Sequence, residues 1–216
     1  AAMVIPNVMD FDSPPPPMDD YARTVRSDLG LVPGQYLILQ PTRIIQRKGI
    51  EHAIELTRRL SLPAELVISH AAGDEGTAYE KRVREFAQLL EVTVRFESAI
   101  VGDRRSVTAD SRKIYTLEDV YPHADLVTYP SAIEGFGNAF LEAIYYKRPL
   151  VVNNYSIYEA DIKPKGFKVV EFDGFISEKT LDDVRYILTH HEESAQQTEQ
   201  NYELARRYYS FTMLER

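Results

Sequence analysis

A basic segment follows a short apolar run near residue 40 and carries Arg43, Arg47 and Lys48. The chain as a whole is acidic, with 25 Lys and Arg against 33 Asp and Glu and a formal net charge of −8. These cations therefore reverse the local charge, which suits an anion such as a diphosphate. A solvated loop whose basic residues only balance nearby acids is the alternative that the sequence leaves open.

A second segment combines two glycines with two carboxylates. Gly135 and Gly137 would let backbone amides approach a ligand closely, and a helix starting at Asn138 would point its positive end at that ligand. Glu134 and Glu142 are eight residues apart, or about 12 Å along a helix, too far for both carboxylates to act on one atom. They suit two ends of an extended ligand, one a sugar hydroxyl and the other a ribose. An ordinary strand–turn–helix corner is the alternative.

Apolar runs alternate with helical periodicity along the chain. The runs predict strands at 36–39, 66–68, 92–96, 126–129, 150–152 and 167–172. The periodicity predicts helices at 49–60, 77–90, 117–123 and 138–147 and from 177 onward, with a polar loop over 102–113. This order predicts an α/β fold, a Rossmann-like doubly wound parallel sheet of about six strands with helices on both faces. Ligands bind such sheets beyond the carboxyl ends of the strands, where the strand order reverses, and both segments described above follow strands.

Composition excludes several classes of protein. The 216 residues include no cysteine, which excludes a disulfide scaffold, a thiolate zinc site and a cysteine nucleophile. The acidic charge argues against a nucleic acid or an anionic membrane as the main partner. No apolar run approaches the ~20 residues that a membrane span requires, and no signal segment opens the chain. We therefore expect a soluble, cytoplasmic protein.

The first twenty residues differ from the rest. A short strand around Ile5 is expected to run into the stiff spacer Pro14–Pro17, because consecutive prolines cannot sit inside a helix or a central strand. Residues 21–216 then form the α/β domain, and a strand ahead of a spacer suggests that another domain was cut away before it.

Two further signals are weaker. Asp10 and Asp12 imitate a D-x-D metal motif, but they precede the prolines instead of following a buried strand, so no metal is expected there. His70 follows a strand at the ligand edge, and a structural role for it is favoured over binding.

In order and spacing, these segments resemble the C-terminal half of the group 1 (family 4) retaining glycosyltransferases, whose GT-B fold has two facing Rossmann-like domains. The most specific match is Glu134–Glu142, which fits the E-x7-E signature of that family. Arg43 and Lys48 also fit, and Ile5–Asn7 resembles the strand that leads into the domain. The resemblance covers nearly the whole chain. It implies that an N-terminal acceptor-binding domain, absent here, would act in cis.

The resemblance also implies roles at the matching positions. Arg43 and Lys48 would bind the diphosphate of a UDP-, GDP- or ADP-sugar and stabilise the leaving group in place of a divalent metal. Glu134 would hold the hydroxyls of the transferred sugar, and Glu142 the ribose. No metal or other cofactor is then required.

The remaining implied contacts come from the backbone and from the next strand. The amides of Gly135, Phe136, Gly137 and Asn138 would lie close to the sugar and the phosphates, and the base would lie against the stretch from Phe96 to Val101. The segment 153–159 departs from the glycine-rich turn that the family usually has there.

The leading hypothesis is therefore a nucleotide-sugar-binding domain of a retaining, metal-independent enzyme that transfers a hexose to a hydroxyl acceptor. This chain alone would bind donor weakly and transfer little. Any peripheral membrane contact would run through the missing half. Two alternatives stay open, a nucleotide-sugar 2-epimerase-like domain of the same fold and a non-catalytic nucleotide-binding or interaction module.

Overall fold

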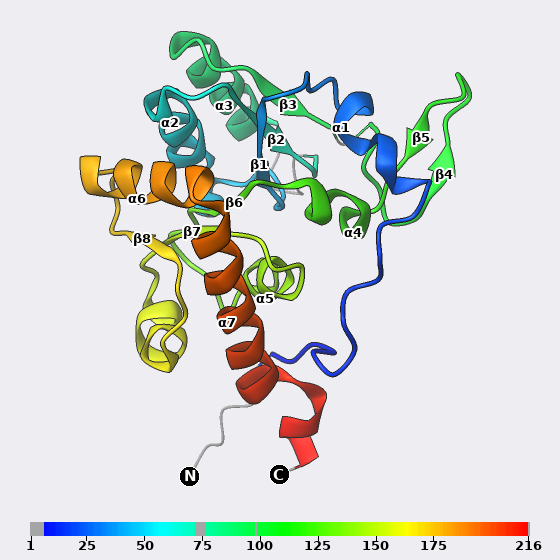
Figure 1. Cartoon of the computed structure of the whole chain (residues 1–216). Helices are drawn as coiled ribbons and strands as arrows, with labels where there is room; N and C mark the ends of the chain where they lie inside the picture. Colours follow the sequence, from blue (N-terminus) through cyan, green and yellow to red (C-terminus); the bar gives the residue numbers. More distant parts are fainter. Residues whose placement is uncertain (1–6, 72–76, 98, 216) are drawn as a thin grey trace.

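A six-stranded parallel sheet forms the centre of the chain (Figure 1). The computed structural model describes residues 7–71, 77–97 and 99–215. The strand order is β3-β2-β1-β6-β7-β8, and every neighbouring pair is parallel. The strands are β1 (Tyr36–Gln40), β2 (Ala64–Ile68), β3 (Val94–Phe96), β6 (Leu126–Tyr129), β7 (Leu150–Asn153) and β8 (Val170–Phe172). The predicted Rossmann-like α/β fold is confirmed.

Helices cover both faces of this sheet (Figure 1). They are α1 (Val25–Asp28), α2 (Ile50–Leu60), α3 (Ala78–Leu89), α4 (Leu117–Val120), α5 (Asn138–Tyr145), α6 (Glu178–Thr189) and α7 (His191–Tyr209). Short 3₁₀ turns lie at Ala22–Thr24, Gln46–Lys48, Tyr121–His123, Lys163–Lys165 and Phe211–Glu215, and a π-helical turn at Tyr158–Ile162. None of the described helices combines the length and the apolar character that crossing a bilayer requires.

Each face of the sheet has its own apolar core. Leu37 and Leu39 of β1 pack with α1, α4, α5 and α7, whereas Ile38 packs with α2, α3 and α6. Successive side chains of a strand point to opposite faces, so a strand buried on both sides is apolar throughout. This explains why the sequence shows continuous apolar runs instead of alternation.

The strand order reverses beside β1. The chain runs from β1 outward to β3, then crosses back to β6, which pairs with β1 on its other side. Ile38 pairs with Leu126 and Leu39 with Val127 in this register. The loops that follow β1 and β6 therefore lie side by side at the carboxyl edge of the sheet.

The predicted polar loop over 102–113 contains a second, two-stranded antiparallel sheet, so the loop prediction is wrong in part. The strands are β4 (Ser106–Val107) and β5 (Lys113–Ile114). Thr108 N donates to Arg112 O at 2.8 Å and closes the turn. The hydroxyl of Tyr21 donates to both strands, at 2.8 and 2.9 Å. Polar residues hide this hairpin from a hydrophobic pattern.

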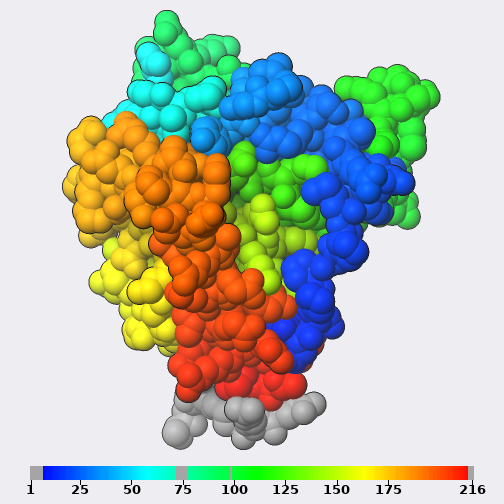
Figure 2. Space-filling view, viewed as in Figure 1, coloured from blue at the N-terminus to red at the C-terminus, as the bar shows by residue number. Residues whose placement is uncertain are grey.

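Residues 7–13, here called the N-terminal strap, lie along the end of α7 (Figures 1 and 2). Met9 N donates to Tyr209 O at 2.9 Å, and Met9 forms a single bridge with Ser210. The strap is thus bound to α7 by a bridge instead of a regular strand. The predicted strand around Ile5 lies almost entirely within residues 1–6, which are outside the described part of the chain.

Candidate functional site

The loops that follow β1 and β6 contact each other directly. Ala132 N donates to Arg47 O at 2.9 Å. Gly49 has a φ of +59°, and a Cβ built on it would lie 2.5 Å from Pro130 O. Only glycine permits that backbone approach. The two segments that the sequence singled out therefore form one unit.

A buried hydrogen-bonded chain joins β1 to β6 beneath these loops. Thr128 Oγ1 donates to Gln40 Oε1 at 2.7 Å, and Gln40 Nε2 donates to Thr42 Oγ1 at 2.7 Å. All three side chains are buried. A satisfied polar network in a core holds its members rigidly. These hydrogen bonds therefore fix the start of the basic loop.

Glu134 pairs with two cations where these loops meet. Lys48 Nζ donates to its Oε1, and Arg47 Nη1 lies 3.1 Å from its Oε2. The side chain of Glu134 is 8% exposed and that of Lys48 is 11% exposed. Burial raises the pKa of Glu134, but the hydrogen bond from Lys48 and the two positive charges lower it more, and the net pKa lies below the usual 4.5. Glu134 is therefore an ionised carboxylate.

A cavity of about 380 Å³ opens above this ion pair. It is the smaller of two adjoining cavities and is here called the smaller cavity. Its lining includes the predicted residues Arg43, Lys48, Glu134, Gly137, Asn138 and Glu142, together with Pro41, Thr42, Arg47, His70, Leu117, Tyr129 and Ala139. The side chain of Arg43 is exposed. The smaller cavity thus brings together cations, a carboxylate and the first residues of α5.

A larger cavity of about 520 Å³ adjoins the smaller one. The two share His70, Leu117 and Glu142 in their linings. The other residues of the larger cavity are Met9, Ser69, Ala71, Val101, Gly102, Asp103, Thr116, Glu118, Tyr121 and Tyr146. Together, the two cavities form an extended site with Glu142 at the junction.

Phe96 and Val101, expected to flank the same ligand, lie apart. Val101 lines the larger cavity, whereas Phe96 is absent from the linings of both cavities. Phe96 packs against the core that contains α2 and α3, and the guanidinium of Arg84 lies 3.6 Å from the centre of its ring. The alternation of side chains along β3 directs it there.

Glu142 stands in an unusual environment for a carboxylate. The hydroxyl of Tyr121 donates to its Oε2 at 2.8 Å. Burial raises the pKa of Glu142 above its usual 4.5, and the nearby charge of Glu118 adds to this effect, while the Tyr121 hydrogen bond opposes it. A half-buried hydrogen-bond acceptor thus stands between the two cavities.

His70 lies at the same junction. Its Nδ1 is 2.7 Å from Ser69 Oγ. Burial lowers the pKa of His70 below 6.5, the charge of Arg43 lowers it further, and that of Asp103 raises it. The imidazole is therefore neutral at pH 7.

The glycine-rich turn divides into two parts. Gly137 lines the smaller cavity with a φ of +105°, and a Cβ there would lie 2.4 Å from the hydroxyl oxygen of Tyr129. Gly135 and Phe136 are absent from the linings of the two cavities. Phe136 instead packs on Tyr209 of α7, with ring centres 5.1 Å apart. The side chain of Phe136 therefore supports the turn from behind.

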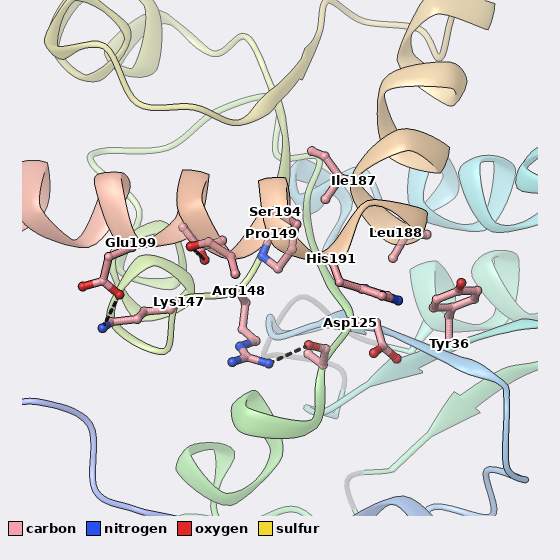
Figure 3. Close-up of a pocket in the computed structure, with 13 residues that line it drawn as sticks. Tyr36, Asp125, Lys147, Arg148, Pro149, Ile187, Leu188, His191, Ser194 and Glu199 are labelled. Atoms are coloured by element: carbon pink, nitrogen blue, oxygen red, sulfur yellow. Dashed lines mark hydrogen bonds and ion pairs between the residues drawn. The ribbon is translucent and has the colours of Figure 1, made fainter.

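A third cavity, of about 320 Å³, lies at the opposite edge of the sheet (Figure 3). Its lining includes Tyr36, Asp125 and Pro149, which stand at the amino ends of β1, β6 and β7. Arg148 and His191 add polar groups to it. Because ligands of such sheets bind at the carboxyl ends, we assign the two adjoining cavities as the candidate site.

Comparison with known proteins identifies the family. The model of the family "Glycosyl transferases group 1" matches residues 22–204. The chain belongs to this family. The resemblance read from the order and spacing of the motifs is thereby confirmed.

Two relatives of this group 1 chain are named mannosylglucosylglycerate synthase. That of Petrotoga mobilis is 33% identical over 187 residues, covering 78% of this chain and 43% of the relative. That of Thermotoga maritima is 32% identical over 243 aligned positions, covering 99% of this chain and 55% of the relative. The chain spans about half the length of the relatives it matches.

Solved structures of GT-B glycosyltransferases share the fold. Anabaena HepE in complex with UDP-glucose has a TM-score of 0.74 at 15% identity, covering 96% of this chain and 53% of HepE. The C-terminal domain of LpcC, a group 1 family protein of Francisella tularensis, has a TM-score of 0.67 at 18% identity, covering 94% of this chain and 99% of that domain. This chain therefore has the fold of one half of a GT-B protein.

Two tyrosines of this candidate site were missed from the sequence, and one pairing was not expected. Arg47, named as a cation of the basic segment, pairs with Glu134, and Tyr121 donates to Glu142. Tyr129 lies beneath Lys48, whose Nζ is 5.6 Å from the ring centre. The position of Tyr129 at the last residue of β6 was the available signal, since strand ends meet ligands in this fold.

Proposed function

We propose that this chain binds a nucleoside diphosphate sugar and is the donor-binding half of a retaining, metal-independent glycosyltransferase that transfers a hexose to a hydroxyl acceptor. One observation carries the proposal. Arg43, Lys48 and Glu134 line a cavity that adjoins a second one across Glu142. A nucleoside diphosphate sugar carries its groups in a matching order, with the sugar and the diphosphate at one end and the ribose and the base at the other.

The smaller cavity would hold the sugar and the diphosphate. Arg43 and Lys48 present positive charge, and Asn138 begins α5, whose amino end favours an anion. As the sugar–phosphate bond breaks, negative charge develops on the departing diphosphate. Fixed cations in a partly buried site stabilise this charge without a metal ion. Glu134, already ionised, would accept hydrogen bonds from the sugar hydroxyls.

The larger cavity would hold the nucleoside. Glu142 stands where a ribose would lie, and its carboxylate can accept both ribose hydroxyls. The base would then extend toward Val101 and Gly102.

The names of similar proteins support the chemistry. The relatives are named as synthases of a compound that contains mannose, glucose and glycerate, which agrees with transfer of a hexose to a hydroxyl group and does not favour the epimerase alternative. HepE was crystallised with UDP and UDP-glucose. Because this chain spans about half of its relatives, the acceptor would be bound by a further domain of a longer protein.

Titration calorimetry tests donor binding. The chain is titrated with UDP, GDP, ADP and the corresponding sugar nucleotides, with EDTA or with Mg²⁺. We expect one nucleoside diphosphate to bind with similar affinity in both buffers and Glu142→Ala to abolish the binding. Glu199→Ala, which changes the third cavity at the opposite edge, is the matched control and should bind normally.

The same titrations separate the alternatives. A chain that binds none of these nucleotides contradicts the proposal and favours an interaction module. Binding that requires Mg²⁺ contradicts the metal-independent part alone. Whether the anomeric configuration of the transferred sugar is retained is tested on a longer protein that includes the acceptor-binding domain. NMR spectra of the product give that configuration.

A further inference from the structure

The N-terminal strap borders both cavities of the candidate site. Met9 is part of the lining of the larger cavity. Asn7 Nδ2 donates to Asn138 Oδ1 at 2.6 Å, and Asn138 lines the smaller cavity. Met9 thus lines the larger cavity, and Asn7, two residues before it, contacts a residue that lines the smaller one.

A backbone hydrogen bond and the aromatic contacts of Phe11 hold the strap in this position. Its backbone N–H donates to Tyr209 O at 2.9 Å. Phe11 is 1% exposed, and its ring centre lies 5.7 Å from that of Tyr145 and 5.5 Å from that of Tyr202. Tyr202 also donates to Phe11 O at 3.0 Å. The side chain of Met9 packs partly against the core that contains α5 and α7, and it also lines the larger cavity, where it can contact a ligand.

We propose that the N-terminal strap is a wall of the donor site, with Met9 in contact with the bound nucleoside and Asn7 as a positioning residue for Asn138. This inference rests on the proposed donor binding. Met9 adds an unbranched, polarizable side chain to a lining that contains the charged groups of Asp103 and Glu118. Such a side chain adapts to the flat face of a base or to the puckered ring of a ribose.

Nucleotide binding should in turn stabilise the N-terminal strap. If the strap contributes to nucleotide binding, the nucleotide must stabilise the strap by the same free energy, because coupling is reciprocal. Occupancy of the site would then be sensed by the segment through which the chain enters this domain.

Thiol labelling tests the contact at Met9. The chain contains no cysteine, so Met9→Cys introduces a unique thiol, and Asp12→Cys gives a control on an exposed strap residue outside both linings. Alkylation by iodoacetamide is followed with and without the nucleoside diphosphate that binds. At about ten times the Kd, bound nucleotide should slow alkylation at position 9 about tenfold. The rate at position 12 should not change.

The result separates this inference from the proposed function. If the wild-type chain binds no nucleotide in the calorimeter, the proposed function fails. If it binds one, and the thiol at position 9 reacts equally fast in its presence, the strap is not a wall of the site and only the present inference fails.

A double-mutant cycle tests Asn7 without changing Met9. Asn7→Ala should weaken nucleotide binding about fivefold, the scale of one hydrogen bond. In an Asn138→Ala background it should have no further effect, because Asn7 acts through Asn138. The midpoint of thermal unfolding should be the same for all variants. An equal loss of affinity in both backgrounds would contradict a positioning role.

Discussion

Lys48 and Glu134 form a buried ion pair that connects the loop after β1 to the loop after β6. The two residues are far apart in sequence and meet because the strand order reverses between these strands. Arg47 adds a second cation to the same carboxylate, at 3.1 Å. The pair therefore helps to set the relative position of the two loops.

Removing Lys48 should cost stability as well as binding. Lys48→Met would leave the buried carboxylate of Glu134 with Arg47 alone, which is more exposed and cannot fully compensate it. We expect the free energy of unfolding to fall by about 2 kcal/mol, since one partner of a buried pair leaves its charge uncompensated when the other is removed. Urea denaturation at pH 7 measures this change.

The matched control adds Glu134→Gln to the same chain. Because the double variant has no uncompensated buried charge, it should regain most of the stability lost in Lys48→Met. A double variant no more stable than the single one would show that the stability lost in Lys48→Met does not come from an uncompensated charge on Glu134.

Arg43 should behave differently from Lys48. Its side chain is exposed, and within the described ranges no ion pair involves it. Arg43→Ala should therefore change the free energy of unfolding by less than about 0.5 kcal/mol. It should weaken nucleoside diphosphate binding by about 1.5 kcal/mol, the scale of a charged hydrogen bond. Calorimetry at low and high salt checks both the loss and its electrostatic origin. Unchanged affinity at low salt would remove Arg43 from the site.

Gly49 should tolerate no side chain. Its φ is +59°, and a Cβ would approach Pro130 O to 2.5 Å. Gly49→Ala should lower the free energy of unfolding by about 2 kcal/mol, because it combines a left-handed backbone with a clash against another backbone. Gly135→Ala, which has nothing within 4 Å of its Cβ, should remain within about 0.5 kcal/mol of wild type. Similar melting curves for the two variants would contradict this distinction.

Much of the fold and part of the site could be predicted from the sequence. Mainly apolar runs marked the inner strands β1, β2, β6 and β7 because these strands are buried on both faces. The edge strands β3 and β8 carry Arg95 and Glu171 and are less buried. The rule that ligands bind at the strand-order reversal was enough to expect Lys48 and Glu134 at one edge. Predicting that these two residues lie close together required no knowledge of side-chain packing.

The remaining features depend on contacts that leave no local pattern. Phe96 ends a strand at the correct edge, but which face it points to depends on the register of β3 with β2. Met9 meets the larger cavity because the strap docks on α7, and no spacing in the first residues encodes that docking.

Glu142 should make the stability of the protein decrease with pH over a defined window. Burial raises its pKa in the folded chain above 4.5, so the folded state keeps a proton that the unfolded state has lost. The free energy of unfolding should then fall as pH rises from 4.5 through the folded pKa, and remain lower above it. Glu142→Gln keeps an acceptor for the hydroxyl of Tyr121 but carries no charge.

At pH 7 the Glu142→Gln variant should therefore be more stable than wild type, and this difference should vanish once the pH falls below the unfolded value of 4.5. The same variant should bind nucleotide more weakly, because the ribose hydroxyls lose a charged acceptor. Urea denaturation across pH 4 to 8 and calorimetry at pH 7 measure the two effects. Parallel stability profiles for the two proteins would mean that the carboxylate is well solvated. A buried charge that costs stability is expected where it serves binding, so the opposite signs of the two effects would mark Glu142 as a functional residue.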